Sequence, residues 1–274
     1  MALTLIGNLF HFSVPSLESN IFFIKDLNIS LYIHTKVATT LIKDYLYTYL
    51  ATKNDQFNYI FKKCNLNPSL LADNKNIYSF YSNQTITNVK NSKKIVFIRN
   101  PWSRLVSWFC NKFIRFHNHP FERKLILMMS FFISNTSEKA GFNFREFINF
   151  LYIAKKELNP NMFIFGDPHL TPQSYRFENT IFDEIYDHAD VNTILSKFNK
   201  ELNFDYTLRT LNQTKRCPRL TQNVSEFYPK DFEKIGIPDY KYFYDDDLIE
   251  KVAFIYQEDI EQFGFTFSTG YTGK

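Results

Sequence analysis

Residues 34–40, His-Thr-Lys-Val-Ala-Thr-Thr, place one lysine among three hydroxyl side chains where a short apolar segment meets a helical pattern. The first turn of a helix has unpaired backbone N–H groups and a positive dipole end, so it can hold a phosphate. Lys36 would add a mobile positive charge, and Thr39 and Thr40 would add hydroxyl donors. The glycines of a Walker loop are absent. The alternative is a solvated lysine followed by two threonines that cap a helix.

A second group of polar residues, within 98–108, suggests another phosphate site. Arg99 follows the apolar run 94–98, and a guanidinium at the tip of a buried strand is costly without an anionic partner. Ser107 lies eight residues later, off the apolar face of a helical pattern. The two side chains would suit a phosphate monoester if they converge, since arginine can bind one with two parallel hydrogen bonds. The alternative is that Arg99 pairs with a structural carboxylate while Arg104 is exposed.

Both groups follow the order strand, loop, helix. Residues 30–34 and 94–98 have the short apolar pattern of buried strands, and residues 38–50 and 102–113 carry apolar side chains at helical spacing. The Asn-Pro pair at 100–101 is typical of a helix start, with asparagine as the cap and proline at the first helical position. Each candidate site therefore lies where a strand leads into a helix.

The rest of the chain continues this alternation. Further strands are predicted at 77–81 and 181–186, and further helices over 121–133, 144–156, 191–201 and 246–263. Alternation of this kind favours an α/β fold whose parallel sheet has helices on both faces. In such sheets ligands bind outside the carboxyl ends of the strands, which is where Lys36 and Arg99 fall.

The composition is that of one folded domain. The 274 residues are 45% hydrophobic and 22% charged, and the absence of repeats or a linker-like stretch predicts a single domain over residues 1–274. The formal net charge of +4 suits an anionic ligand but does not require nucleic acid. No apolar run reaches the roughly 18 residues of a membrane helix. Without a basic signal-peptide start, and with three widely spaced cysteines that suit neither disulfides nor zinc, we expect a cytoplasmic protein.

The two phosphate-binding candidates together resemble the paired nucleotide-binding motifs of sulfotransferases that use 3′-phosphoadenosine-5′-phosphosulfate (PAPS). Residues 35–40, Thr-Lys-Val-Ala-Thr-Thr, are similar to the pattern P-K-x-[AG]-x-[ST], with threonine in place of proline. Residues 99–107, Arg-Asn-Pro-Trp-Ser-Arg-Leu-Val-Ser, closely match R-[ND]-P-x-x-R-x-x-S. Segments similar to the carbohydrate (Golgi-type) branch follow at 167–173, 182–187, 212–216 and 244–264, so the resemblance covers about residues 31–265.

The resemblance implies a three-layer α/β sandwich related to P-loop nucleotide kinases. It also implies transfer of a sulfuryl group from PAPS to a hydroxyl of a carbohydrate or glycolipid. The nucleotide-binding residues would be Thr35, Lys36, Val37, Ala38, Thr39, Thr40, Arg99, Ser107, Lys215 and Arg216. Lys36 would also stabilise the leaving phosphate.

The proton of the acceptor hydroxyl requires a base, for which an imidazole is suitable near neutral pH. His169 lies in the segment 167–173 that resembles the carbohydrate branch, and it is the first candidate. His34 adjoins the phosphosulfate loop and is the second, although strand alternation turns it toward the core. The scheme requires no metal, and the sequence has no cluster of metal-ligand residues.

Two other classes of function stay open at this point. A P-loop-type nucleotide kinase would bind ATP with magnesium, but the missing Walker glycines and the Arg99–Ser107 pair favour a sulfotransferase. A non-catalytic module for anionic glycans would use the basic surface and would not bind adenosine 3′,5′-bisphosphate. The expected partner is a glycan or glycolipid, including one carried on a membrane surface, and not a nucleic acid.

Overall fold

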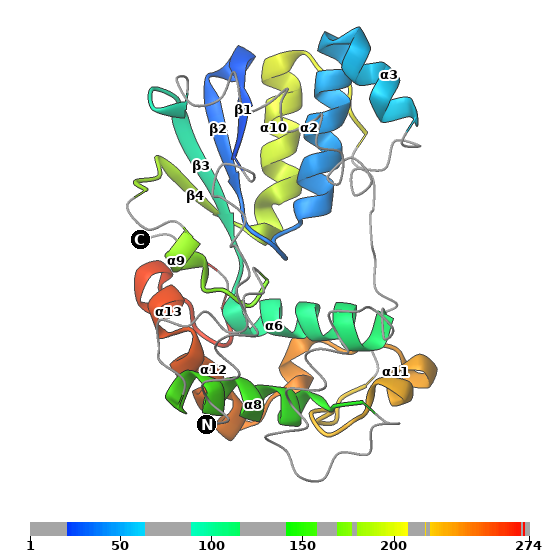
Figure 1. The fold of residues 1–274 in the computed structure, drawn as a ribbon, viewed down its shortest axis with the longest axis vertical. Helices are drawn as coiled ribbons and strands as arrows, with labels where there is room; N and C mark the ends of the chain where they lie inside the picture. The colour runs from blue at the N-terminus through cyan, green and yellow to red at the C-terminus, as the bar shows by residue number, and fades with distance from the viewer. Residues whose placement is uncertain are drawn as a thin grey trace, which may run out of the picture.

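The structure is a computed structural model that describes residues 21–63, 89–115, 141–157, 169–176, 180–207, 217, 220–269 and 271. A four-stranded sheet in the order β1-β2-β3-β4 forms its centre (Figure 1). The strands β2 (Ile29–Ile33), β3 (Lys93–Ile98) and β4 (Glu184–Asp187) are parallel, and β1 (Ile21–Ile24) is antiparallel to β2. The prediction of an α/β fold with a mainly parallel sheet is confirmed. The antiparallel edge strand β1 is not among the predicted strands.

The two faces of the sheet belong to two hydrophobic clusters, because side chains alternate along each strand. Leu31 and Phe97 lie in one cluster with residues of α2 (Thr39–Lys53) and α10 (Val191–Leu202). These two helices run side by side along the sheet (Figure 1). Val96 lies between two residues of the first cluster along β3, but it belongs to the second cluster. The second cluster includes the helices beyond the carboxyl end of the sheet.

The helices beyond the carboxyl end of β3 form a second layered region (Figure 1). They are α6 (Pro101–Phe109), α8 (Phe144–Glu157), α12 (Asp246–Ile255) and α13 (Gln257–Phe263). Aromatic side chains fill the space between them. Trp108 of α6 stacks on Phe147 of α8 with ring centroids 4.9 Å apart and planes 10° apart. Phenylalanine side chains, which are abundant in the sequence, therefore pack between the helices that carry the site.

Side-chain caps begin α6, where the sequence predicts one, and α8. At α6 the side-chain oxygen of Asn100 accepts from the backbone N–H groups of Trp102 and Ser103. At α8 Asn143 and Glu146 each accept the backbone N–H of the other at 2.9 Å, which is a capping box. The pattern 102–113 continues past α6 as a π-helical turn over Cys110–Arg115, a geometry that is frequent near functional sites.

Two boundaries and one additional helix differ from the predictions. The helix expected over 246–263 breaks at Tyr256, where φ is −117° and the tyrosine hydroxyl donates to the Leu170 carbonyl at 2.8 Å. The strand expected from residue 181 begins only at Glu184, because Ile181 is 87% exposed. A helix, α3 (Asp55–Lys63), lies in a polar stretch for which no element is predicted. The break at Tyr256 is thus accompanied by a contact with a residue that is distant in the sequence.

The remaining described elements are short. They are η2 (Lys25–Leu27), α9 (Gln173–Arg176), η5 (His188–Asp190), α11 (Pro229–Ile235) and η6 (Tyr240–Phe243). The strand predicted at 77–81 and the helix predicted at 121–133 lie outside the described residues. Within the described ranges, no helix combines the length and apolar character needed to cross a bilayer.

Candidate functional site

The loop after β2 has the backbone form of an anion site. Lys36 and Ala38 lie at φ 65° and 58°, while Val37 between them has no positive φ. Such alternation turns successive backbone N–H groups toward one concavity, a form that binds phosphates elsewhere. Two non-glycine residues at positive φ carry backbone strain, which concentrates at functional sites.

The start of α2 leaves this concavity available to a ligand. Ala38 is the N-cap residue, and it has no side chain that could cap the first N–H groups of the helix. The hydroxyl of Thr39 donates to the His34 carbonyl at 2.7 Å, so it closes the loop instead of capping the helix. The alternative in which the threonines serve only as helix caps is therefore not favoured. Thr40 lies half-buried in the same first turn.

Lys36 joins this loop to two neighbouring elements. Its ammonium donates to the side-chain oxygen of Asn111 at 2.7 Å, in the π-helical turn after α6. Its carbonyl accepts from the Nη1 of Arg99 at 3.1 Å, at the tip of β3. Lys36, in the first candidate segment, thus contacts Arg99 in the second segment and Asn111 just after it.

Arg99 is held at both its backbone and its side chain. Its Nε donates to the Ser103 hydroxyl at 3.0 Å. Its backbone N–H donates to Gln173 Oε1 at 2.8 Å, and its carbonyl accepts from Gln173 Nε2 at 2.7 Å. The contacts of the guanidinium with Ser103 and Lys36 are both to neutral oxygens.

Ser107 lies in α6 between two residues that contact the candidate cations. Ser103 and Ser107 are spaced four residues apart in α6, and Asn111 follows in the π-helical turn. Ser103 contacts Arg99, and Asn111 contacts Lys36. Ser107 lies between them in the sequence and is half-buried.

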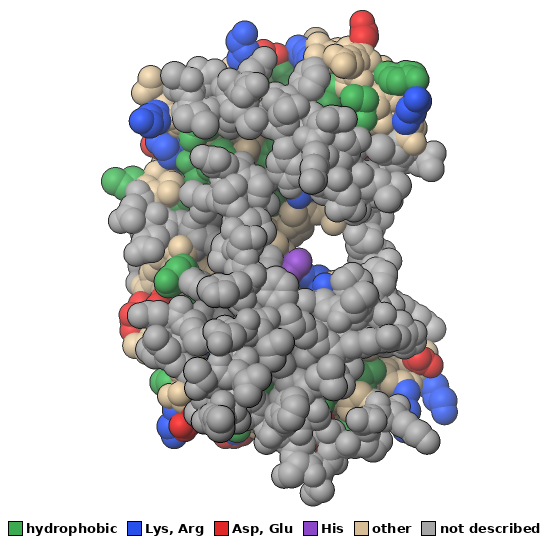
Figure 2. Space-filling view, in the orientation of Figure 1, with side chains coloured by type: hydrophobic (Ala, Val, Ile, Leu, Met, Phe, Trp, Pro, Cys, Tyr) green, Lys and Arg blue, Asp and Glu red, His purple; other side chains and the backbone are tan. Residues whose placement is uncertain are grey.

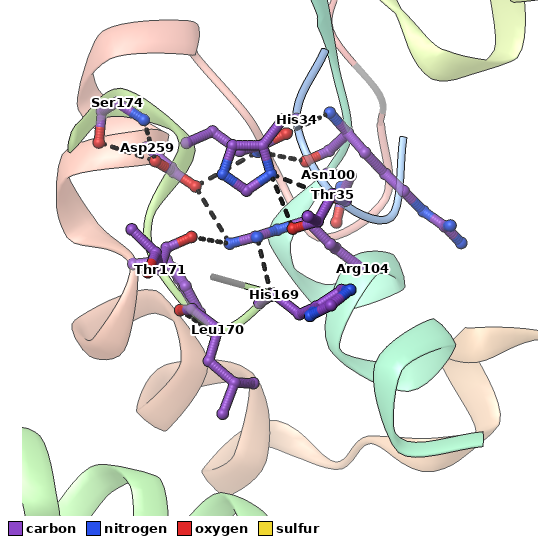
Figure 3. Close-up of polar contacts among 12 residues, drawn as sticks. His34, Thr35, Asn100, Arg104, His169, Leu170, Thr171, Ser174 and Asp259 are labelled. Carbon is purple, nitrogen blue, oxygen red and sulfur yellow. Dashed lines mark hydrogen bonds and ion pairs between the residues drawn. The ribbon is translucent and has the colours of Figure 1, made fainter. Parts of the chain in front are cut away.

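Arg104 is buried, with 1% of its surface exposed, and the alternative that placed it on the surface is wrong. Its guanidinium donates to the carbonyls of His169 at 3.1 Å and Thr171 at 3.0 Å, and lies 3.7 Å from Asp259 (Figure 3). Figure 3 shows that the His169 carbonyl faces Arg104, while its imidazole extends away from Thr171 and Asp259. That imidazole is half-buried.

His34 has a different environment from His169. It is fully buried, and its Nδ1 lies 3.0 Å from the Thr35 carbonyl and 3.4 Å from the Thr35 hydroxyl. The turn of its side chain toward the interior agrees with the strand alternation. Lys215 and Arg216 lie outside the described residues.

The surface is hollowed near the middle of the face drawn in Figure 2, and a histidine and Lys or Arg side chains are visible inside the hollow. Across the described ranges, no group of three or more His, Cys, Asp or Glu side chains is placed to hold a metal ion. The loop after β2, together with the side chains of Lys36 and Arg99, can supply backbone N–H donors, hydroxyl donors and positive charge to an anion.

Sequence reasoning missed a dyad at the carboxyl end of β4. Asp187 Oδ1 lies 2.8 Å from His188 Nδ1, and Asp187 Oδ2 accepts from the backbone of Tyr271 at 2.9 Å. Burial alone would raise the pKa of Asp187, but its hydrogen bonds to His188, Ala189 and Tyr271 lower it overall. The strand register pairs Ile98 with Asp187, so the dyad adjoins Arg99. An Asp-His pair after a predicted strand was the only available signal.

The stability of the protein should depend on the protonation of His188. Burial lowers the pKa of His188, although its bond to Asp187 acts in the opposite sense. The unfolded chain therefore binds the proton first as the pH falls from 7, and folding stability falls with it. His188→Gln should reduce the slope of unfolding free energy against pH between pH 7 and 5, by at most about 1.4 kcal/mol per pH unit. Urea denaturation at a series of pH values measures the slope, and equal slopes would contradict this account.

Comparison with known proteins gives one match that covers most of the chain. The model of the Sulfotransferase family matches residues 19–266, which include both phosphate-binding candidates, the His169 segment and the dyad. No curated protein and no solved structure matches the chain significantly. Because the family model spans well over half of the sequence, the chain belongs to the sulfotransferase family.

Proposed function

We propose that this sulfotransferase takes its sulfuryl group from PAPS and transfers it to a hydroxyl of a carbohydrate or glycolipid. The observation that carries the proposal is the 3.1 Å hydrogen bond from Arg99 to the Lys36 carbonyl. It joins the loop suited to a 5′-phosphosulfate to the arginine suited to a 3′-phosphate. PAPS carries these two anionic groups on one ribose, so two adjacent anion sites fit it better than a donor with a single phosphate chain.

The two sites lie at the correct edge of the sheet for such a ligand. β2 and β3 are parallel neighbours, and residues 36 and 99 follow their carboxyl ends. Neighbouring strands are about 4.8 Å apart, so backbone donors after β2 and the guanidinium after β3 can reach one nucleotide together. Ser107 would add a hydroxyl donor on the Arg99 side.

The reaction forms a bond between the acceptor oxygen and sulfur, and it breaks the bond between sulfur and a phosphate oxygen. The acceptor proton moves to a base. Negative charge grows on the phosphate oxygen that leaves, and Lys36 together with the N–H groups of the loop would stabilise it. By analogy with phosphoryl transfer, positioning and charge stabilisation supply most of the rate enhancement.

His169 suits the role of base better than His34 does. An imidazole that accepts a proton from an acceptor must be reachable by it. His34 is fully buried, whereas His169 is half-buried and has its backbone fixed by Arg104. The proposal therefore assigns the proton to His169. Because loops determine acceptor specificity in such folds, a labelled-PAPS transfer screen over a panel of glycans is the way to identify the acceptor.

Nucleotide binding tests the proposed donor without any acceptor. Adenosine 3′,5′-bisphosphate differs from AMP only in the 3′-phosphate assigned to Arg99 and Ser107. At about 100 times Kd, a ligand that binds only the folded protein adds about 2.7 kcal/mol. At roughly 2–4 °C per kcal/mol, the bisphosphate should raise Tm by about 5–10 °C, and AMP at equal concentration should raise it much less.

The variants of this experiment separate the contributions of individual side chains. Arg99→Ala should remove most of the preference for the bisphosphate, because a charge-assisted contact is lost. Ser107→Ala should remove less, because only one neutral donor is lost. Arg145→Ala is a matched control, since this arginine on α8 binds Glu226 at 3.2 Å and Asp245 instead. Equal protection of the wild-type protein by AMP and the bisphosphate would overturn the proposal.

A further inference from the structure

A buried polar network connects residues that have no assigned contact with the nucleotide. Arg104 comes from α6, Gln173 from α9, and Tyr256 and Asp259 from the break between α12 and α13 and from α13. We infer that this network is a positioning device that holds Arg99 and the His169 segment in one fixed relation. The inference rests on the proposed function, because it concerns the residues assigned there to the 3′-phosphate and to the base.

Asp259 is the centre of the network. It is fully buried, and its Oδ1 accepts from the backbone and the hydroxyl of Ser174, both at 2.8 Å. Its Oδ2 accepts from Gln173 Nε2 at 3.3 Å and lies 3.7 Å from Arg104 Nη2. One carboxylate thus contacts α6 and both of the first two residues of α9.

The first group that the network holds is Arg99. The Gln173 amide, itself fully buried, bonds both the N–H and the carbonyl of Arg99, at 2.8 and 2.7 Å. Two bonds to one residue fix its peptide planes as a sheet neighbour would. Because β3 ends at Ile98, Gln173 extends the ordered backbone by the one residue that carries the guanidinium.

The second group is the segment that carries His169. Three consecutive carbonyls, of His169, Leu170 and Thr171, accept from Arg104 Nη1, the Tyr256 hydroxyl and Arg104 Nη2, at 3.1, 2.8 and 3.0 Å. The Arg104 guanidinium also lies 5.1 Å from the centre of the Tyr256 ring. The planar fork of an arginine can bond two carbonyls and a carboxylate together, which the single ammonium of a lysine cannot do in the same geometry.

Stability alone is a poor explanation for this buried pair. Apolar residues of similar volume can often replace a buried ion pair without loss of stability, because desolvation cancels much of the attraction. What the apolar replacement cannot do is bond the carbonyls of His169 and Thr171, or accept from the Gln173 amide that bonds Arg99. The network therefore fixes the distance between a phosphate-binding arginine and a base, and small errors in such distances are costly in rate.

The closing experiment measures affinities for two nucleotides, corrected for the folded fraction. Gln173→Met should raise the Kd of adenosine 3′,5′-bisphosphate about tenfold, as expected when a charged contact is misplaced. It should change the Kd of AMP by less than about twofold. Arg104→Lys should give the same pattern. In a double-mutant cycle, Gln173→Met added to Arg99→Ala should cause no further loss, because both changes act on one contact.

Hydrogen exchange measures the coupling between Arg104 and Arg99 without a ligand. Arg104→Lys should speed exchange of the Arg99 amide, which bonds Gln173 and not Arg104. Arg145→Met is the control, because it removes an arginine that binds Asp245 and Glu226 and should leave both readouts unchanged. The inference would be overturned if Kd rose equally for both nucleotides, or if the effects of the two substitutions were additive in the cycle. Unchanged hydrogen exchange of the Arg99 amide would also overturn it. If the wild-type protein showed no preference for the bisphosphate, the proposed function would be wrong. The exchange result would still decide whether Arg104 and Arg99 are coupled.

Discussion

Replacing Lys36 with alanine is expected to lower kcat by about 10²- to 10³-fold, the usual effect of losing one donor to developing charge. The nucleotide Kd should change much less, because the backbone N–H groups of residues 36–38 and the Arg99 side remain. An interaction that strengthens only in the transition state changes kcat and leaves ground-state binding nearly intact. Steady-state turnover and calorimetric binding of PAPS in the absence of acceptor measure the two quantities.

Lys53→Ala provides the matched control for this prediction. Lys53 is the last residue of α2, the helix that follows the Lys36 loop, and its replacement removes the same charge, but it is an exposed residue that pairs with Asp26 at 3.0 Å. Its removal should leave turnover unchanged, since exposed ion pairs contribute little. Turnover of Lys36→Ala close to that of Lys53→Ala would remove Lys36 from the mechanism. A tenfold or larger rise in Kd with unchanged kcat would make Lys36 a binding residue only.

Local signals were enough to predict the frame of the site. Short apolar runs located β2 and β3, and the Asn100-Pro101 pair located the start of α6. These features depend on residues that are close in sequence, which is why pattern reading succeeds for them. The positive φ of Lys36 and Ala38 gave no such signal, because neither position is a glycine and the strain is imposed by the surrounding loop.

The residues that hold the site together could not be predicted in the same way. Gln173 contacts Arg99 across 74 positions, and Ser174 contacts Asp259 across 85. No periodicity or spacing in the sequence predicts such pairs, because they depend on how α9 and α13 are placed by the fold. Asn111 was missed for a related reason: the π-helical turn brings it to Lys36, and a regular pattern would not specify that register.

The assignment of the base gives the second large expected effect. His169→Asn should reduce turnover on the order of 10²-fold or more, the usual contribution of a positioned general base. The fold should be retained, because Arg104 bonds the backbone carbonyl of residue 169, which an asparagine keeps. Nucleotide affinity should also be retained. This combination distinguishes His169 from Arg104, whose substitution is expected to alter nucleotide affinity.

The pH dependence of turnover tests that assignment independently of the magnitude. A histidine base must be neutral to accept the proton, so turnover of the wild-type protein should fall on the acidic side as the imidazole becomes protonated. In His169→Asn the acidic limb should disappear, because no group at that position titrates near neutral pH. His188→Gln is the comparison, since His188 is the other described histidine that is partly exposed and it adjoins Arg99. It should keep the acidic limb. Loss of that limb in His188→Gln and its retention in His169→Asn would transfer the role of base to the Asp187–His188 dyad.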